Sequence, residues 1–155
     1  MIVSSLTIRD FKTDDFDALC MIDQVCFPKD RVFSRAEFVL YFNHPQRIAR
    51  VAETEDRILG FVLAHIQNSF CARVLTLDVI PEARKCGIAT RLMNALHEEL
   101  KRQAITACLL EVGVDNIPAQ HLYEILHYYY IGTLPGYYCG REDAYQLIRL
   151  CDSDN

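Results

Sequence analysis

The stretch that decides the fold is LDVIPEARKCGIATRLMNAL, residues 77–96. Its apolar start is typical of a β-strand, and Pro81 ends that strand because proline cannot donate to a sheet ladder. From Gly87 onward, apolar residues recur at helical spacing with charges on the far side, which predicts a helix over residues 86–103. The chain therefore turns from strand to helix through two cations, a thiol and a glycine.

A helix that begins at this turn offers a binding site for an anion. Its first backbone N–H groups lack partners within the helix and lie at the positive end of the helix dipole. Gly87 lets a ligand approach the backbone closely, and Arg84 and Lys85 add positive charge. Thr90 and Arg91 add donors one turn further on. These residues match neither a Walker A loop nor a GxGxxG fingerprint, so they fit an anion site or an ordinary solvated turn.

Composition points to one globular domain over residues 1–155, with 51% hydrophobic and 24% charged residues. The net charge of −5 and the pI of about 5.5 argue against nucleic acid as the main partner. No apolar run approaches the roughly 18 residues needed to span a bilayer, and the N-terminus does not resemble a signal peptide. We therefore expect a cytoplasmic protein, a monomer or homodimer, that does not bind membranes.

The seven cysteines form no CxxC pair and no ligand spacing with histidine, which predicts reduced thiols and no metal site. Cys86 is the exception, because a thiol at a helix N-terminus beside Arg84 and Lys85 is a candidate for a lowered pKa. The alternative is a small residue that fills a crowded turn.

Hydrophobic periodicity predicts the order β-α-α-β-β-β-α-β-α-β-β, which is typical of an α/β (α+β) layered domain. Thr13 is expected to cap the first helix, Ser34 and Glu37 to form a capping box on the second, and Glu55-Asp56 to form a turn. Asn116 is expected to cap the last helix, with Pro118 in its first turn. The predicted helices cover 13–27, 34–42, 86–103 and 116–126, and the strands cover 4–11, three segments within 47–80, 105–112, 128–134 and 143–150.

Four segments in this order resemble the GNAT family of N-acetyltransferases. Residues 77–96 are similar to its acetyl-CoA-binding motif, a strand followed by Q/R-x-x-G-x-G/A and a helix. LEVGVDNIPAQHLYEIL, residues 110–126, resembles the family's next strand and its Asn-initiated helix with LYE. VCFPKDRVFSRAEF, residues 25–38, and GYYCGREDAYQLI, residues 136–148, resemble two loops of the RimI and Ard1-like branch, which acetylates protein N-termini.

The resemblance implies a strongly twisted mixed sheet of about seven strands and about four helices, splayed open between two central parallel strands. Acetyl-CoA would bind in that opening, with its pantetheine arm along Leu77 and Val79 and its pyrophosphate on the amides of residues 85–90. The resemblance assigns cofactor contacts to Leu77, Asp78, Val79, Arg84, Lys85, Cys86, Gly87, Ile88, Ala89, Thr90, Asn116 and Tyr123.

The chemistry of acetyl transfer calls for one base and one acid. An α-amine is mostly protonated at pH 7 and must lose a proton before it attacks the thioester, and the departing thiolate is better released as a thiol. Glu111 ends an apolar strand, where it is either a base with a pKa raised by burial or a salt-bridged strand end. Tyr123 is either a core tyrosine or the acid. The resemblance favours the catalytic role for both, and the N–H near Val79 would polarise the thioester carbonyl.

The resemblance assigns contacts with the acceptor substrate to Phe27, Pro28, Tyr137 and Tyr138. These residues lie in the two loops that flank the peptide groove in RimI-like enzymes. The family usually has Gly where His127 stands, and a longer polar residue at Gly113. We therefore expect an acetyltransferase acting on a protein N-terminus. The alternatives are a GNAT enzyme acting on lysine or a small amine, an acyl-CoA-binding module without catalysis, and a nucleotide-binding regulator of another fold.

Overall fold

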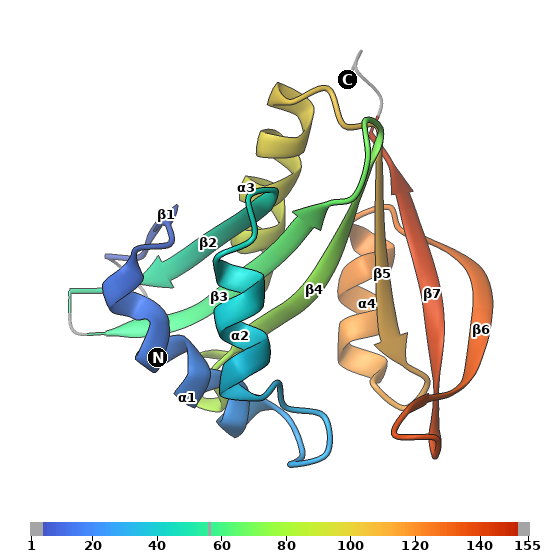
Figure 1. Cartoon of the computed structure of the whole chain (residues 1–155), viewed down its shortest axis with the longest axis horizontal. Helices are drawn as coiled ribbons and strands as arrows, with labels where there is room; N and C mark the ends of the chain where they lie inside the picture. Colours follow the sequence, from blue (N-terminus) through green and yellow to red (C-terminus); the bar gives the residue numbers. More distant parts are fainter. Residues whose placement is uncertain (1–4, 56, 152–155) are drawn as a thin grey trace.

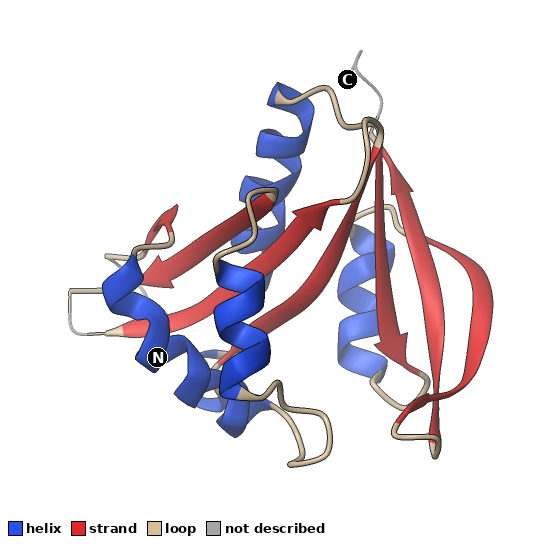
Figure 2. Ribbon diagram, viewed as in Figure 1, coloured by secondary structure: helices blue, strands red, loops and turns tan. Residues whose placement is uncertain are grey.

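The computed structural model describes residues 5–55 and 57–151. In this part of the chain, seven strands form one sheet in the order β1-β2-β3-β4-β5-β7-β6. All neighbours pair antiparallel except β4 and β5, which are parallel. The expected mixed sheet is confirmed (Figures 1 and 2). The strands are β1 (Thr7–Asp10), β2 (Arg47–Glu53), β3 (Ile58–Ile66), β4 (Cys71–Val79), β5 (Ala107–Gly113), β6 (Tyr129–Tyr138) and β7 (Glu142–Leu150).

Four α-helices cover the two faces of the sheet. α1 (Phe16–Cys26) and α2 (Arg35–Phe42) lie in front in Figure 1, and α3 (Ile88–Arg102) crosses behind β2, β3 and β4. α4 (Ile117–Ile125) follows β5 in the chain and lies beside it in Figure 1. The aromatic side chains of Phe38, Phe42 and Phe61 join α2 to β3 in the buried core. The aromatic face of α2 is thus buried against the sheet.

One of the two helix starts predicted near the N-terminus is confirmed, and the other is wrong. Ser34 accepts a hydrogen bond from the Glu37 N–H, and Glu37 accepts one from the Ser34 N–H, so the capping box is confirmed. The expected Thr13 cap is wrong: Thr13 begins a short 3-10 turn, η1 (Thr13–Asp15), and α1 starts only at Phe16. The reason is Asp15, whose carboxylate accepts the Lys12 N–H at 2.7 Å and closes the chain into this tighter turn.

The central parallel pair explains why the sheet opens. β4 and β5 pair only over Cys71–Arg73 and Ala107–Leu109. Directly beyond, the register between β3 and β4 shifts so that Leu75 stands in a β-bulge. A bulge bends and twists its strand, which turns the rest of β4 away from β5.

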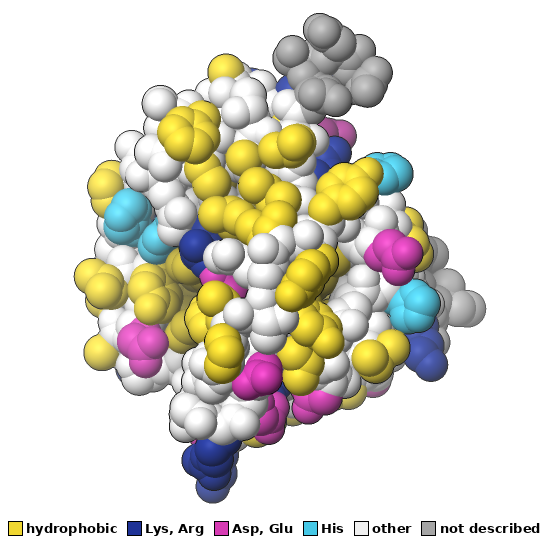
Figure 3. Space-filling view, turned by 90° about the vertical axis from the view of Figure 1, so that its right-hand side faces the viewer, with side chains coloured by type: hydrophobic (Ala, Val, Ile, Leu, Met, Phe, Trp, Pro, Cys, Tyr) yellow, Lys and Arg dark blue, Asp and Glu magenta, His cyan; other side chains and the backbone are white. Residues whose placement is uncertain are grey.

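The C-terminal hairpin forms the second half of the molecule. We expected a loop over residues 135–142, but β6 continues to Tyr138 because it bulges between Leu134 and Tyr138 while keeping its pairing with β7. β6 is an edge strand, and it exposes Tyr129, Tyr130 and Ile131. Hydrophobic side chains accordingly gather on the face shown in Figure 3.

Two further expectations fall partly outside the described residues: Ser4 of the first predicted strand and Asp56 of the predicted turn. None of the helices in residues 5–55 and 57–151 combines the length and hydropathy needed to cross a bilayer.

Candidate active site

The opening between β4 and β5 exposes main-chain groups of β4. The Ile80 N–H donates to the Leu59 carbonyl of β3, so residues of even number at this end of β4 direct their main chain toward β3. Leu77 and Val79 therefore direct theirs the other way, toward the opening, beyond the point where pairing with β5 ends. An extended ligand with amide groups can add to this edge as a strand does.

Asp78 differs from its two neighbours in the same predicted stretch. Its main chain is in register with Phe61 of β3, and its side chain is 1% exposed. In this part of β4 the main-chain groups of Leu77 and Val79, and not those of Asp78, face the opening.

The carbonyl of Val79 is a meeting point of three segments. Arg84 Nε donates to it at 3.0 Å, and the Cys26 thiol donates to it at 3.3 Å. Arg84 thus folds back on β4 and braces the strand-to-helix turn, in addition to leaving a positive charge beside it. Burial raises the pKa of the Cys26 thiol to about 11, so this thiol stays neutral at physiological pH.

The predicted anion site lies at an exposed helix start. Gly87 precedes α3 at φ 80°, and Lys85 also has a positive φ of 61°. A Cβ built on Gly87 would meet nothing within 4 Å, so it is the backbone conformation that requires glycine here. Lys85, Cys86 and Gly87 are exposed, Ala89 and Thr90 are partly exposed, and Ile88 is buried in the core. The amides that open α3 therefore face solvent beside two cations, which suits a pyrophosphate.

Glu111 lies where the two central strands part. Its side chain is 6% exposed and forms an ion pair with Arg73 of β4. Arg73 is in register with Leu109 on β5, two residues before Glu111, so both side chains lie on the face of the sheet that α1 and α2 cover. Glu111 is therefore salt-bridged at the strand end, which is the second of the two alternatives given above, and its role as the base stays a prediction. Sequence reasoning missed Arg73, because a contact between strands that are distant in sequence leaves no local signal.

Tyr123 approaches from the opposite face, on α4. Its side chain is 7% exposed, and its ring packs on Tyr128 with centroids 5.6 Å apart. Burial raises the pKa of its hydroxyl above the ordinary value, with Tyr138, Asp78 and Cys108 adding to the shift. The hydroxyl thus stays protonated at physiological pH, which suits a proton donor. Asn116, as expected, caps α4 by accepting the Ala119 N–H at 3.3 Å.

The two predicted acceptor loops meet each other across the mouth of the opening. Arg31 stacks on the Tyr138 ring, with its guanidinium carbon 4.2 Å from the ring centroid, and forms an ion pair with Glu142. The Cys139 thiol donates to the Asp30 carbonyl at 2.9 Å. Phe27 is half-buried at the C-terminal end of α1, Pro28 is exposed, and Tyr137 packs edge-on against Tyr138. Arg31 and Asp30, which the sequence pattern did not single out, thus join these loops.

The two departures from the family pattern have structural explanations. His127 adopts φ 66° directly after α4, where the family usually has Gly. A Cβ on Gly113 would lie 2.9 Å from the Asp115 carboxylate and 3.5 Å from Arg31 Nη1. A longer side chain at residue 113 would therefore have to displace Asp115.

Comparisons with known proteins place the chain in a family. The family model for the acetyltransferase (GNAT) family matches residues 16–128. A protein named N-alpha-acetyltransferase from Saccharolobus solfataricus is 29% identical over 155 residues, covering 92% of each chain. The crystal structure of Ard1 from Thermoplasma volcanium has a TM-score of 0.85 at 25% identity, with 96% of this chain and 99% of that chain covered. The ribosomal-protein-S18-alanine N-acetyltransferase from Escherichia coli shares the fold, with a TM-score of 0.86 at 22% identity and with 97% and 96% covered.

Because the family model covers most of the chain, the chain belongs to the acetyltransferase (GNAT) family, and it is an acetyl-CoA-dependent N-acetyltransferase.

Proposed function

We propose that this enzyme acetylates the α-amino group at the N-terminus of a protein or peptide. The observation that carries the proposal is the mouth of the opening, where the loop after α1 and the β6–β7 hairpin contact each other through Arg31 and Tyr138. Between two loops that contact each other, a free chain end fits better as the acceptor than an internal side chain on a folded surface does. The N-alpha-acetyltransferase from Saccharolobus solfataricus, which matches over its length, supports the same acceptor class.

In the proposed reaction, Glu111 accepts a proton from the acceptor ammonium group. The neutral amine attacks the thioester carbonyl, the C–N bond forms and the C–S bond breaks. Tyr123 gives its proton to the departing sulfur, the acetylated nitrogen releases its second proton to the Tyr123 oxygen, and Glu111 returns its proton to solvent. The Val79 N–H, which faces the opening, would donate to the carbonyl oxygen.

The proposed cofactor contacts follow from the same geometry. Leu77 and Val79 offer main-chain groups to the pantetheine amides, and the amides of residues 85–90 offer donors to the pyrophosphate. Asn116 and Tyr123, at the start and in the interior of α4, would border the thiol end of the arm.

The test is transfer of labelled acetyl from acetyl-CoA to a panel of peptides. Each peptide carries a free N-terminus, a blocked N-terminus with an internal lysine, or both. Label on free N-termini alone is the expected result. Label on lysine, or on polyamines and aminoglycosides but on no peptide, would contradict the proposed acceptor. A label readout is needed because seven cysteines would disturb thiol detection.

A further inference from the structure

Two carboxyl groups meet inside the protein beside the cofactor strand. Asp23 of α1 and Asp78 of β4 are each 1% exposed, and their carboxyl groups lie within hydrogen-bonding range of each other. The Thr76 hydroxyl donates to Asp78 Oδ1, and the Phe33 N–H donates to Asp23 Oδ2 at 2.9 Å. Among the residues that the structure describes, Asp78 Oδ2 is the one buried side-chain oxygen or nitrogen without a protein donor.

Two ionised carboxylates cannot share such a site at acceptable cost. Like charges in contact repel, and a buried oxygen without a donor loses its hydration without compensation. A single proton between the groups removes one charge and provides the missing donor. We propose that Asp23 and Asp78 share one proton, and that this carboxyl–carboxylate hydrogen bond positions the loop of residues 27–34 against β4.

The surrounding groups agree with a retained proton. Burial is the largest cause that raises the pKa of both carboxyls. The contact with Asp23 raises the pKa of Asp78 further, whereas the hydrogen bond with Asp78 lowers that of Asp23, as expected if Asp78 carries the proton. Glu37 of α2 faces Asp23 with another negative charge, while neutral Cys26 and Tyr123 face Asp78 from α1 and α4. Arg84 is the cation that acts on Asp78, and it ranks below the other causes.

The Asp23–Asp78 pair connects the proposed cofactor strand, β4, with the proposed acceptor loop, residues 27–34. Asp78 precedes Val79, whose main chain faces the opening, and Asp23 holds the Phe33 N–H at the end of the loop. Earlier in the same loop, Arg31 stacks on Tyr138 of the hairpin. The effect on the acceptor rests on the proposed function, whereas the shared proton does not.

The shared proton gives stability a definite pH dependence. The native pair holds a proton at pH values where the unfolded aspartates have lost theirs, so stability falls as pH rises from the ordinary aspartate range through the raised native pKa. Asp78→Asn keeps a donor for Asp23 and an acceptor for Thr76 but does not titrate. We expect the melting temperature of the wild type to fall, relative to that of Asp78→Asn, as pH rises above the ordinary aspartate range.

Asp17→Asn is the matched control, because Asp17 is an exposed carboxylate on the same helix and should leave the wild-type pH curve unchanged. Carbon NMR of aspartate-labelled wild type should show one protonated side-chain carboxyl at neutral pH, a readout that needs no variant to fold. Parallel melting curves for wild type and Asp78→Asn, or ionised signals for every aspartate at neutral pH, would overturn the shared proton.

The positioning role is tested by kinetics with a peptide acceptor. Asp78→Ala should raise the KM for the acceptor about tenfold while the Kd for acetyl-CoA stays within about twofold, and Asp78→Asn should restore the acceptor KM. A rise confined to the acetyl-CoA Kd would overturn the positioning of the loop. If no peptide is acetylated at all, the proposed function fails, and the melting and NMR results still decide the shared proton.

Discussion

Glu111 forms an ion pair with Arg73 at the point where β4 and β5 part. We expect Glu111→Gln to lower turnover about a hundredfold at neutral pH, because the amide cannot accept the ammonium proton. The loss of turnover should be smaller at alkaline pH, because the acceptor amine is already deprotonated in solution there. Measuring kcat against pH, with acetyl-CoA binding by calorimetry, checks this prediction. Retained binding shows an intact cofactor site, whereas unchanged turnover across pH would exclude Glu111 as the base.

Tyr123 offers a matched test on the opposite face of the sheet. Its ring packs on Tyr128, a contact that phenylalanine keeps, so Tyr123→Phe should leave the free energy of unfolding within about 0.5 kcal/mol of wild type. Turnover should nevertheless fall at least about tenfold, because the departing sulfur loses its proton donor. Denaturant unfolding and steady-state kinetics on one preparation separate these effects. Full activity in Tyr123→Phe would mean that another group protonates the sulfur.

His127 shows how far a single residue can be predicted. Its positive φ was foreseeable from its place directly after a helix, where the family has Gly. Asp23 also left a signal, because it follows Leu19 by four residues and Phe16 by seven on the apolar face of α1. The partner of Asp23 left none, since Asp78 lies on a strand that only the folded sheet brings to α1.

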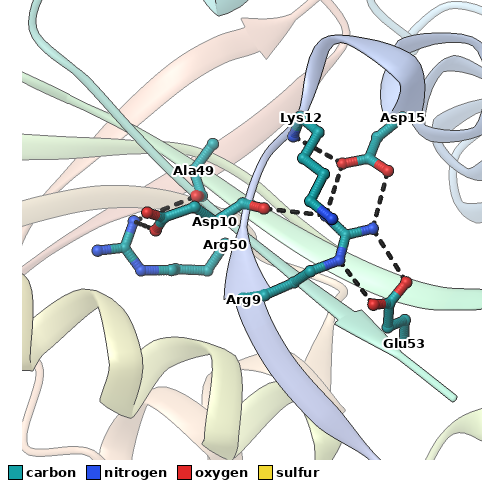
Figure 4. Close-up of polar contacts among 7 residues, drawn as sticks. All are labelled: Arg9, Asp10, Lys12, Asp15, Ala49, Arg50 and Glu53. Atoms are coloured by element: carbon teal, nitrogen blue, oxygen red, sulfur yellow. Dashed lines mark hydrogen bonds and ion pairs between the residues drawn. The ribbon is translucent and has the colours of Figure 1, made fainter.

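At the scale of elements, the first strand and first helix are joined by Arg9. Figure 4 shows its guanidinium between Asp15 and Glu53, with Nη1 2.8 Å from the Asp15 carboxylate and Nε 2.7 Å from that of Glu53. Arg9 therefore connects β1, η1 and β2. Arg50 forms a separate pair with Asp10 nearby, and it also reaches the Ala49 carbonyl.

Removing this guanidinium should destabilise the fold. Asp15 is 7% exposed and would lose its main partner, so Arg9→Ala should cost about 2 kcal/mol in unfolding free energy at neutral pH. Arg57→Ala is the control, because Arg57 and Glu82 form an exposed pair that should contribute little. Urea denaturation measures both. Equal losses in the two variants would show that the Arg9 network stabilises no more than a surface pair does.

The same network predicts how acid acts on the protein. Arg9 holds the pKa of Asp15 below its ordinary value, so Asp15 stabilises the fold at pH values above that of the unfolded carboxyl. This contribution is lost as pH falls through the lowered native pKa. The acid branch of the wild-type stability curve should accordingly be steeper than that of Arg9→Ala, as thermal unfolding between about pH 2 and about pH 5 would reveal. Identical acid branches would contradict the role of Arg9.

The bounds of helices and strands were predictable where the sequence signal is local, and were not where pairing between strands sets them. Ser34 and Glu37 fixed the start of α2 through three residues of sequence, and α3 followed from its apolar stripe. The Leu75 bulge and the long β6 strand depend on partners in β3 and β7, which periodicity along one strand does not describe. The opening that defines the site arises at that bulge, so its place came from the family resemblance rather than from the pattern of residues.

At the scale of the whole molecule, the sheet is two halves joined by a short ladder. β4 and β5 share only three residue pairs, and beyond them the main chain of Leu77 and Val79 faces the opening. A ligand that adds to β4 as a strand and bridges toward α4 should therefore stabilise both halves together. A saturating ligand at a hundred times its Kd contributes about 2.7 kcal/mol.

Hydrogen exchange with and without acetyl-CoA tests this arrangement residue by residue. We expect new protection at the amides of Leu77 and Val79 and across residues 85–90, because these N–H groups would gain acceptors in the bound state. The amide of Asp78, already in the ladder with β3, should change little, and β1 and β2 serve as internal controls far from the opening. Protection confined to residues 85–90 would keep the pyrophosphate site but remove the added strand, while protection of Asp78 in place of Leu77 and Val79 would mean that the main chain of β4 is turned the other way.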